Sequence, residues 1–326
     1  IGDYDIDGVC STYILLRGLT RAGAEVDTDI PDRKKDGYGL NEDLVKRAYD
    51  AGVDTIVTCD NGIAAVKEIA YAKSLGMTVI ITDHHELQEE IPPADVVVNP
   101  HQKDCPYPYK NLCGAGVAWK LVSALWEQLG VPEQELYEDL LLFAGFATVG
   151  DVMDLTGENR ILVKEALKLL KITSHPGISA LIEVNEISRE AISAFHIGFV
   201  LGPCINASGR LDTAKRALEL LKTTDYEKAL VKAAELKALN DERKSMTDDG
   251  VQQALDQIEN SDMKRDRVLV IYLPDCHESL AGIIAGRIRE RYYRPVFVLT
   301  RSQDGVKGSG RSIETYSMFE EMSKCK

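Results

Sequence analysis

The sequence predicts a mixed α/β protein: a parallel sheet with a helical half, a long connecting helix and a second, smaller α/β domain. Near the start of the chain, short apolar runs suited to strands alternate with amphipathic runs suited to helices, and the same alternation returns near the end. Between the two regions, apolar residues recur every three or four positions, as on one face of a helix. A chain of 326 residues is longer than one domain usually needs, so we expect two domains.

The first part of the chain contains the elements of a parallel sheet. Strands are expected at 55–59, 77–82 and 95–98, with helices at 42–51 and 63–75. Alternation of this kind is typical of strand–helix–strand units with parallel strands.

A mainly helical region follows from 117 to 199. Its clearest periodic runs are 121–129, 136–146 and 161–170. We interpret this region as a helical half packed on the sheet.

The last third of the chain predicts a connector and a second α/β unit. Its expected elements are a short helix at 213–221, a long helix at 225–258, a strand at 268–273, a helix at 280–292, a strand at 296–300, a glycine-rich turn and a helix at 316–324. The polar remainder of the long helix suggests a partly exposed connector. We therefore place the domain boundaries at 1–212, 213–262 for the connecting helices, and 263–326.

Composition narrows the class of protein. No apolar run of 18 residues and no signal peptide is present, so neither a membrane span nor secretion is expected. Seven cysteines without a C-x-x-C pair predict free thiols in a reducing compartment, the cytoplasm. The spacing of Cys105 and Cys113 does not suit a zinc site.

The charge is unevenly distributed along the chain. A net charge of −14 argues against a protein that binds DNA over its whole surface. From 264 to 311, however, ten basic residues stand against five acidic ones. An acidic body with a basic C-terminal piece suits a nuclease that binds one strand in a cleft. A solvated basic helix face explains Arg287, Arg289, Arg291 and Arg294, taken individually, about equally well.

Four short segments place acidic residues next to apolar runs. They are Asp3-Tyr4-Asp5-Ile6-Asp7-Gly8, Asp60 after the first strand, Asp83-His84-His85 after the second, and Asp151 after a long apolar segment. In an open α/β sheet such ends gather at one crevice, so the four segments are expected to meet there. Carboxylates suit hard divalent ions and imidazole shifts the preference toward Mn²⁺, so we expect Mn²⁺ with Mg²⁺ as a substitute. A lone Asp or His is usually structural, but four such segments make that explanation poor.

The four segments, in this order, resemble the motifs of the DHH phosphoesterase superfamily, and within it the RecJ branch of single-strand-specific exonucleases. Two later segments support that branch: 202–210, which reads GPCINASGR, and 277–312, which contains GSGRS. The resemblance covers nearly the whole chain, unlike a chance match to one motif. It implies a DHH domain at 1–212 and a DHHA1 domain at 263–326. Both ends look cut, so we expect a fragment of a longer protein.

The resemblance implies a two-ion centre whose metal ligands are Asp3, Asp5, Asp60, His84 and Asp151. Asp60 would bridge both ions and His85 would face the scissile phosphate, so these two are the expected catalytic residues. Two ions can activate a water and stabilise both oxygens of an in-line displacement. Many members have a histidine where this chain has Ile1, so the first ion is expected to be held weakly. Asp7 is expected to cap the turn or helix that follows it.

The resemblance also implies substrate-binding residues, which are Arg33, Asn206, Arg210, His277, Ser309 and Arg311. Guanidinium groups bind phosphate oxygens bidentately, and glycines let backbone amides approach an anion. Arg33, Ser309 and Arg311 would contact a 5′ phosphate, and Arg210 would contact a phosphate nearer the scissile bond. Alternatively, Arg210 makes a loop salt bridge, the glycine segment is an ordinary hairpin turn, and His277 caps the next helix.

The implied activity is metal-dependent 5′-to-3′ hydrolysis of single-stranded DNA to nucleoside 5′-monophosphates, in repair and recombination. The implied partners are single-stranded DNA and, through regions outside this chain, a single-strand-binding protein and a helicase. An oligoribonucleotide or cyclic-dinucleotide phosphodiesterase and a non-catalytic DNA-binding relative are the alternatives. The full set of acidic motif residues argues against a non-catalytic relative. An inorganic pyrophosphatase is disfavoured by the length of the chain and by the long connector.

Overall fold

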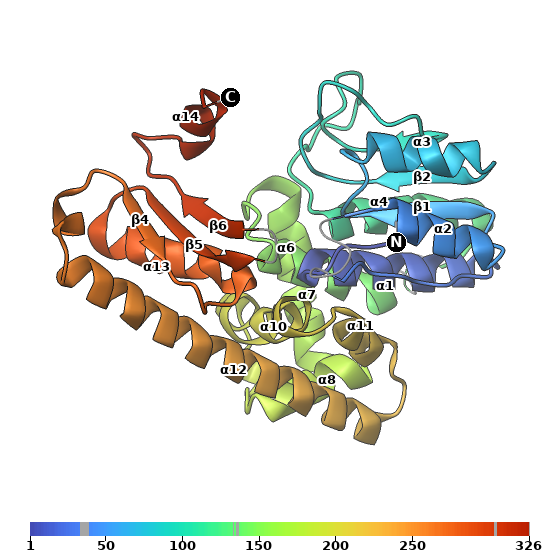
Figure 1. Ribbon diagram of the computed structural model, residues 1–326. Helices are drawn as coiled ribbons and strands as arrows, with labels where there is room; N and C mark the ends of the chain where they lie inside the picture. Colours follow the sequence, from blue (N-terminus) through green and yellow to red (C-terminus); the bar gives the residue numbers. More distant parts are fainter. Residues whose placement is uncertain (33–38, 133, 135–136, 303–304, 326) are drawn as a thin grey trace. The chain divides into compact units, whose positions relative to one another are not determined.

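The computed structural model describes residues 1–32, 39–132, 134, 137–302 and 305–325 (Figure 1). Two compact units, Ile1–Ala238 and Leu239–Lys326, divide the chain within helix α12 (Tyr226–Glu259). The long helix predicted at 225–258 is therefore confirmed. The domain boundaries expected at 212 and 262 stay a prediction.

A parallel sheet in the order β1-β2-β3 belongs to the first unit. Its strands, β1 (Thr55–Cys59), β2 (Thr78–Thr82) and β3 (Val96–Val98), confirm the three predicted strands. Cys59 pairs with Thr82 and Thr82 with Val98, so all three strands end in register. Ile1 lies beside β1, where its amino group donates to the Val57 carbonyl at 2.8 Å and its carbonyl accepts from the Cys59 amide at 3.0 Å. The first acidic segment thus starts next to the carboxyl end of β1.

The rest of the first unit is helical, as predicted. Its helices are α1 (Ile6–Arg21), α2 (Glu42–Asp50), α3 (Val66–Ser74), α4 (Gly114–Leu129), the π-helix η1 (Tyr137–Leu141), α6 (Leu142–Gly150), α7 (Gly157–Ile172), α8 (Pro176–Val184), η2 (Arg189–Ala191), α9 (Ala194–His196), the π-helix η3 (Ile197–Leu201), α10 (Gly202–Leu211) and α11 (Lys215–Lys222). Both tryptophans of the chain, Trp119 and Trp126, lie on α4. Trp126 is buried and donates to the Gly18 carbonyl at 2.9 Å, which fixes α4 against α1.

The core of the first unit has two parts. Helices α2 and α3 cover the sheet through buried apolar side chains such as Leu44, Ile69 and Val79. Between α1, α4 and α6 the buried residues include Ile14 and Phe143. Helices α1 and α4 also contact β1, so both parts adjoin the strand that leads to Asp60.

The second unit contains a smaller sheet in the order β4-β5-β6. Strands β4 (Leu269–Tyr272) and β5 (Val296–Ser302) are parallel and are joined by α13 (Ala281–Tyr292), while β6 (Gly305–Arg311) runs antiparallel to β5. Short helices η4 (Asp262–Arg265), η5 (Glu278–Leu280) and α14 (Met318–Ser323) complete the unit. Figure 1 shows α13 lying across one face of this sheet. The predicted strand–helix–strand unit is confirmed.

The glycine-rich segment after β5 corrects the sequence prediction, because it is the strand β6 and not a turn. A methyl group at Gly308 would lie 2.4 Å from Leu299 Cδ2, and one at Gly310 would lie 2.7 Å from Met318 Cε. The glycines therefore make room for large neighbouring side chains, although glycine is usually depleted in strands.

None of the helices in the described part of the chain has the length and apolar content needed to cross a membrane.

Candidate metal centre

The first acidic segment forms the start of α1. Asp5 is the N-cap residue, and its Oδ1 accepts hydrogen bonds from the amides of Asp7 at 2.9 Å and Gly8 at 3.1 Å. Gly8 lies directly on the preceding chain, since a methyl group there would be 2.3 Å from the Asp3 carbonyl oxygen. This packing keeps the buried Asp3 close to Asp5.

Asp7 does not make the cap expected of it. Its buried carboxylate instead accepts from the amides of Gly114 at 2.6 Å and Ala115 at 2.8 Å, the first two residues of α4. Asp7 thus caps a different helix, and Asp5 caps α1. The prediction was wrong because capping patterns in a sequence are local, whereas this partner lies 107 residues away.

Asp60 follows β1 directly and adopts a left-handed backbone conformation with a φ of 59°. Such a conformation costs a non-glycine residue about 1–3 kcal/mol, so the surroundings must hold it in place. The Asp60 amide donates to the Thr82 carbonyl at the end of β2 at 3.1 Å. Its side chain is 2% exposed, and among the described residues nothing donates a hydrogen bond to its Oδ1. A buried carboxylate oxygen without a hydrogen-bond donor lowers the stability of the fold unless a bound cation takes the place of the donor.

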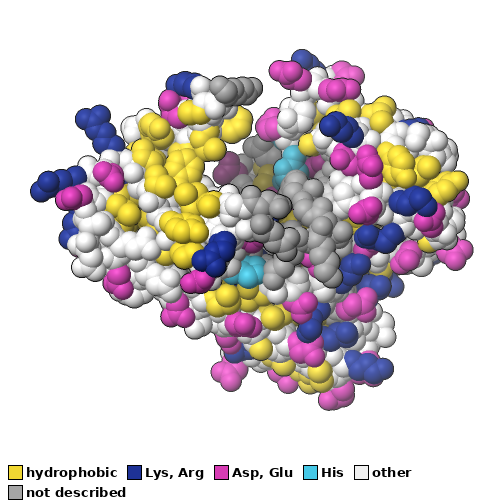
Figure 2. Space-filling model, in the orientation of Figure 1, with side chains coloured by type: hydrophobic (Ala, Val, Ile, Leu, Met, Phe, Trp, Pro, Cys, Tyr) yellow, Lys and Arg dark blue, Asp and Glu magenta, His cyan; other side chains and the backbone are white. Residues whose placement is uncertain are grey.

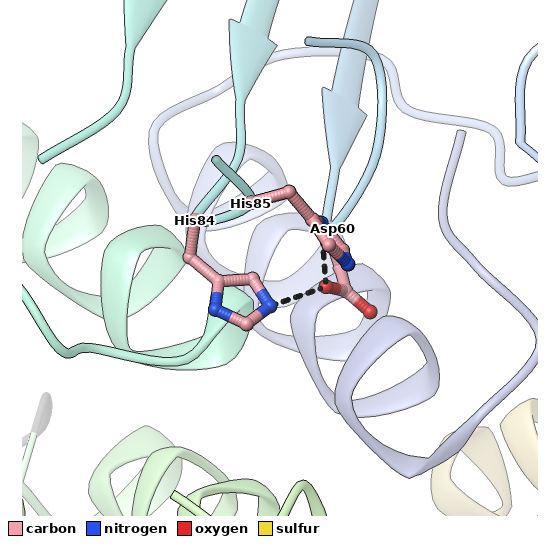
Figure 3. Close-up of side chains that lie close together, drawn as sticks. All are labelled: Asp60, His84 and His85. Atoms are coloured by element: carbon pink, nitrogen blue, oxygen red, sulfur yellow. Dashed lines mark ion pairs between the residues drawn. The ribbon is translucent and has the colours of Figure 1, made fainter. Parts of the chain in front are cut away.

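His84 and His85 both approach Asp60 (Figure 3). His84 is 10% exposed, and its Nε2 lies 3.1 Å from Asp60 Oδ1, 3.5 Å from Asp7 Oδ2 and 3.7 Å from Asp151 Oδ2. The contact with Asp60 lacks hydrogen-bond geometry, which is why Oδ1 still has no donor. His85 is 43% exposed, and its Nδ1 lies 4.0 Å from Asp60 Oδ1. His84 is thus buried among carboxylates, whereas His85 borders the solvent.

Asp83 orients His85. Its Oδ1 lies 2.8 Å from His85 Nδ1 and accepts from the amides of His84 at 2.7 Å and His85 at 3.1 Å. Its Oδ2 accepts from the Ile63 amide at 2.9 Å. Sequence reasoning named Asp83 only as part of its motif, yet this residue fixes the imidazole beside the cluster.

Asp151 follows α6, so the fourth segment is the end of a helix and not of a strand. The end of α6 packs on the start of α1, since a methyl group at Gly150 would lie 2.6 Å from Ile6 Cδ1. Val152 has a left-handed φ of 58°, which turns the chain directly after Asp151.

The predicted ligands form three overlapping groups in which the ligand atoms lie within 4.8 Å of one another. The groups are Asp3 with Asp5 and Asp60, Asp7 with His84 and Asp151, and Asp60 with His84 and His85. The structure therefore brings the six predicted metal and catalytic residues together and adds Asp7. Asp60 and His84 each belong to two of the groups, and of the two only Asp60 has a carboxylate, whose two oxygens are what a bridging ligand needs.

The electrostatics of this cluster favour a bound cation. Burial raises the pKa of Asp5, Asp60 and Asp151, and the neighbouring carboxylates raise each further. Burial lowers the pKa of His84, so its ring is held in the neutral form that can ligate a metal. A divalent cation would relieve the repulsion among the carboxylates and offset their desolvation. Carboxylates with one imidazole fit Mn²⁺ or Mg²⁺.

In the pair of Asp83 and His85 the pKa shifts are reversed: the pKa of the histidine is raised and that of the carboxyl group is lowered. The hydrogen bond with Asp83 raises the pKa of His85. Burial raises the pKa of Asp83, but the hydrogen bond and the charge of His85, together with backbone amides, outweigh this effect, and the pKa of Asp83 is lowered. The hydrogen bond with Asp83 therefore favours the protonated form of the His85 ring more than solvent alone would.

Two predicted substrate-binding residues lie on α10, which packs on the first acidic segment. Asn206 Oδ1 accepts from the Ile6 amide at 2.7 Å, so Asn206 supports the start of α1. A methyl group at Gly209 would lie 2.2 Å from the Tyr4 carbonyl oxygen. Arg210 follows in the last turn of α10. Arg33 lies outside the described residues.

The other predicted substrate-binding residues lie in the second unit, where Ser309 and Arg311 form a cluster at the start of α13. A methyl group at Gly282 would lie 2.8 Å from Arg311 Nη2 and 2.9 Å from Ser309 Oγ, so both side chains cover the first turn of α13. His277 caps η5, where its Nδ1 accepts from the Ser279 amide at 3.3 Å, which was one of the alternatives left open. The sequence did not point to Gly282, because this residue contributes only the space that the Arg311 and Ser309 side chains occupy.

The basic residues of the second unit are partly neutralised by acidic neighbours. Lys307 pairs with Glu278 at 3.2 Å, and Arg287 pairs with Asp248. On the face displayed in Figure 2, Lys and Arg side chains are interspersed with Asp and Glu. The excess of basic residues therefore does not form one continuous patch on that face.

Comparison with known proteins gives matches along the whole chain. Residues 1–145, which contain three of the four acidic segments, match the DHH family, N-terminal domain. The chain is 39% identical over 100% of its length to the single-stranded-DNA-specific exonuclease RecJ of Bacillus subtilis and covers 41% of that protein. It is 37% identical over 99% of its length to the Escherichia coli protein of the same name and covers 59% of it. The chain thus spans about half the length of these curated relatives.

Solved structures also share this fold, among them two of RecJ. A crystal structure of exonuclease RecJ bound to manganese has a TM-score of 0.85 and 36% identity, with 99% of this chain and 79% of that chain covered. RecJ from Thermus thermophilus in complex with Mn²⁺ has a TM-score of 0.86 and 33% identity, with 99% and 46% covered.

Proposed function

Because the chain belongs to the DHH phosphoesterase family, we propose that it forms the catalytic part of an exonuclease that hydrolyses single-stranded DNA from the 5′ end to nucleoside 5′-monophosphates. One observation carries the proposal: the buried Asp60 carboxylate has an oxygen without a hydrogen-bond donor at the centre of a cluster of Asp and His side chains, within the described residues. Such an arrangement is suited to cations that activate a phosphodiester for hydrolysis.

The expected cofactors are two Mn²⁺ ions, or Mg²⁺ in their place, held by Asp3, Asp5, Asp60, His84 and Asp151. Bound ions of this kind lower the pKa of a water and stabilise negative charge on the attacking and leaving oxygens. The protein positions the donors: Asp60 contributes to two groups of ligand atoms, and its left-handed backbone turns its carboxylate into the cluster.

His85 would act on the substrate. Asp83 holds the imidazole through Nδ1 and raises its pKa, which favours a protonated ring that can donate to a phosphate oxygen. With 43% of its side chain exposed, His85 is also accessible from solvent, unlike His84. These features support the division of roles between a ligand, His84, and a catalytic donor, His85.

The 5′ end of the strand would bind in the second unit. Ser309 and Arg311 pack over Gly282 in the first turn of α13, where both side chains would donate hydrogen bonds to a phosphate. Arg33 and Arg210 are proposed as further phosphate contacts. A terminal phosphate carries more charge than an internal diester and would be preferred by such a cluster, giving 5′-to-3′ polarity.

We also propose a cytoplasmic role in DNA repair and recombination, with single-stranded DNA as the substrate. A single-strand-binding protein and a helicase are the proposed protein partners, contacted through regions outside this chain. Seven free cysteines support a reducing compartment.

The experiment that tests the proposal measures mononucleotide release from 5′-phosphorylated single strands with Mn²⁺ present. Asp60→Ala should lower the rate by more than about 100-fold, beyond the loss typical of residues that only support a ligand. Glu25→Ala removes an exposed carboxylate beyond the far end of α1 and serves as the control. Substantial turnover by Asp60→Ala would contradict a metal centre built on this residue. Faster cleavage of RNA dinucleotides than of long DNA by the unaltered chain would favour the oligoribonucleotide alternative.

A further inference from the structure

The first turn of α4, residues Cys113 to Gly116, contacts three of the four segments that carry metal ligands. At Gly114, a methyl group would lie 2.7 Å from Asp60 Cβ and 3.0 Å from Asp60 Oδ1. Cys113 Sγ lies 3.5 Å from Thr148 Oγ1, on the helix that ends before Asp151. The third contact is the pair of hydrogen bonds from the Gly114 and Ala115 amides to Asp7.

Asp7 supplies the main cap of α4. Its two carboxylate oxygens each accept one amide, at 2.6 and 2.8 Å, and these charge-assisted bonds to the start of a helix are short and strong. The side chain of the N-cap residue itself, Cys113, accepts only a weak bond at 3.4 Å from the Gly116 amide. The position of the first turn of α4 therefore depends on a residue of the first acidic segment.

The same turn supports the strained conformation of Asp60. Asp60 has a left-handed backbone, and the bare Gly114 backbone packs against its Cα and Cβ. A side chain at position 114 would displace Asp60, because the clash is with backbone and Cβ atoms that cannot rotate away. Asp7 and Asp60 are thus linked through a single glycine.

We propose that Asp7 is a positioning residue for the metal centre: it fixes the first turn of α4, which in turn holds Asp60 through Gly114. Asp7 Oδ2 lies only 3.5 Å from His84 Nε2, so distance alone would also allow Asp7 to be a ligand. Its oxygens already accept backbone amides, whereas Asp60 Oδ1 has no donor within the described residues. The proposal rests on the proposed function in one respect, that the cluster binds divalent cations.

The test is calorimetric titration of the chain with Mn²⁺, with all variants first shown to be folded by circular dichroism. Asp7→Asn loses one of the two amide contacts and should bind two ions with an affinity lowered by about 10–100-fold, as is typical for residues that orient metal ligands. Gly114→Ala should lower the affinity in the same way. Because both changes act through the same turn, the double variant should lose less than the product of the two single losses.

Gly116→Ala is the matched control. It adds a methyl group in the same turn, at an ordinary contact distance of 3.4 Å from Leu112, and away from Asp60. Its Mn²⁺ affinity should equal that of the unaltered chain.

Three results would overturn the inference. Loss of one whole ion by Asp7→Asn, with both ions retained by Gly114→Ala, would make Asp7 a ligand. An unaltered Mn²⁺ affinity in Asp7→Asn would show that Asp7 has no role in the metal centre. If Asp7→Asn does not fold, unaltered affinity in Gly114→Ala alone contradicts the link to Asp60. Failure of the unaltered chain to bind Mn²⁺ would instead refute the proposed function as a whole.

Discussion

His84 and His85 are neighbours in the sequence, but their imidazole rings have different surroundings. We predict that His84→Ala weakens Mn²⁺ binding by more than about 10-fold, since a direct ligand contributes at least as much as its supporting residues. His85→Ala should leave Mn²⁺ affinity nearly unchanged and lower the rate at saturating Mn²⁺ by about 100-fold or more, the usual contribution of a proton donor. Calorimetric titration and single-strand hydrolysis measure the two effects. Equal loss of metal in both variants would contradict the division of roles.

His175 is a second histidine whose surroundings determine its protonation. Its Nδ1 caps α8 by accepting from the Ile178 amide at 3.3 Å, and its Nε2 lies 3.0 Å from the Tyr13 hydroxyl. Burial lowers the pKa of His175 to about 4. The unfolded chain, with a histidine pKa of about 6.5, therefore binds more protons than the folded chain between these two values.

This difference predicts how stability depends on pH. The contribution of His175 is fully present above a pH of about 6.5 and is lost as the pH falls toward about 4, by up to about 3 kcal/mol. In His175→Gln, an amide oxygen can replace the cap without titrating, so the free energy of unfolding should fall less between pH 7 and pH 5 than in the unaltered chain. Urea titrations at the two pH values measure this difference. The same pH dependence in both proteins would show that folding does not lower the pKa of His175.

For the single residues of the metal centre, the sequence predicted which side chains would lie together but not which contacts hold them in place. The motif order was enough to select Asp60, His84 and Asp151, because strand and helix ends gather at one edge of a parallel sheet. The partners of Asp7, on α4, could not be predicted, because a hydrogen bond to a remote helix leaves no local pattern in the sequence. The functional roles of these residues stay predictions.

Among the elements, β6 and α13 together determine the phosphate site proposed in the second unit. We predict that Arg311→Ala reduces the preference for 5′-phosphorylated over 5′-hydroxyl strands by about 10-fold or more, since a hydrogen bond to a charged group contributes about 1.5–3 kcal/mol. Gly282→Ala should act in the same direction, because its methyl group would push Arg311 and Ser309 away from the turn. The ratio of the two cleavage rates is the measurement.

Gly286 offers a matched control for this prediction. It lies one turn further along α13, and nothing in the described part of the chain lies within 4 Å of a methyl group added there. Gly286→Ala should therefore keep the ratio of rates while favouring the helix slightly. An unaltered ratio in Arg311→Ala would place recognition of the 5′ end elsewhere.

The strands and helices themselves were predictable where apolar periodicity was strong. The predicted strands at 55–59, 77–82 and 296–300 agree with β1, β2 and β5 to within two residues at either end. β6 was not predicted, because alternating glycines are the usual signal of a turn. Only the packing of Leu299 and Met318 over these glycines shows why a strand fits there.

For the whole molecule, the mixed α/β class and the long helix α12 followed from the sequence, but the position of the division between the two units did not. Ala229, Ala233 and Leu236 are buried before the division, and Ala254 and Ile258 belong to the core of the second unit. Helical periodicity is the same in both parts, so the sequence alone cannot assign each turn to a unit.

The placement of both tryptophans on α4 has a spectroscopic consequence. Trp119 and Trp126 belong to the unit that contains the cluster of Asp and His side chains, and the second unit contains no tryptophan. Tryptophan emission, excited where tyrosine does not absorb, therefore reports the folding of the first unit alone, whereas far-ultraviolet circular dichroism reports the helices of both. The two signals coincide in a urea titration only if the chain unfolds in one cooperative step. The two tryptophans of the chain therefore serve as an intrinsic fluorescence probe of the unit that we propose to be catalytic.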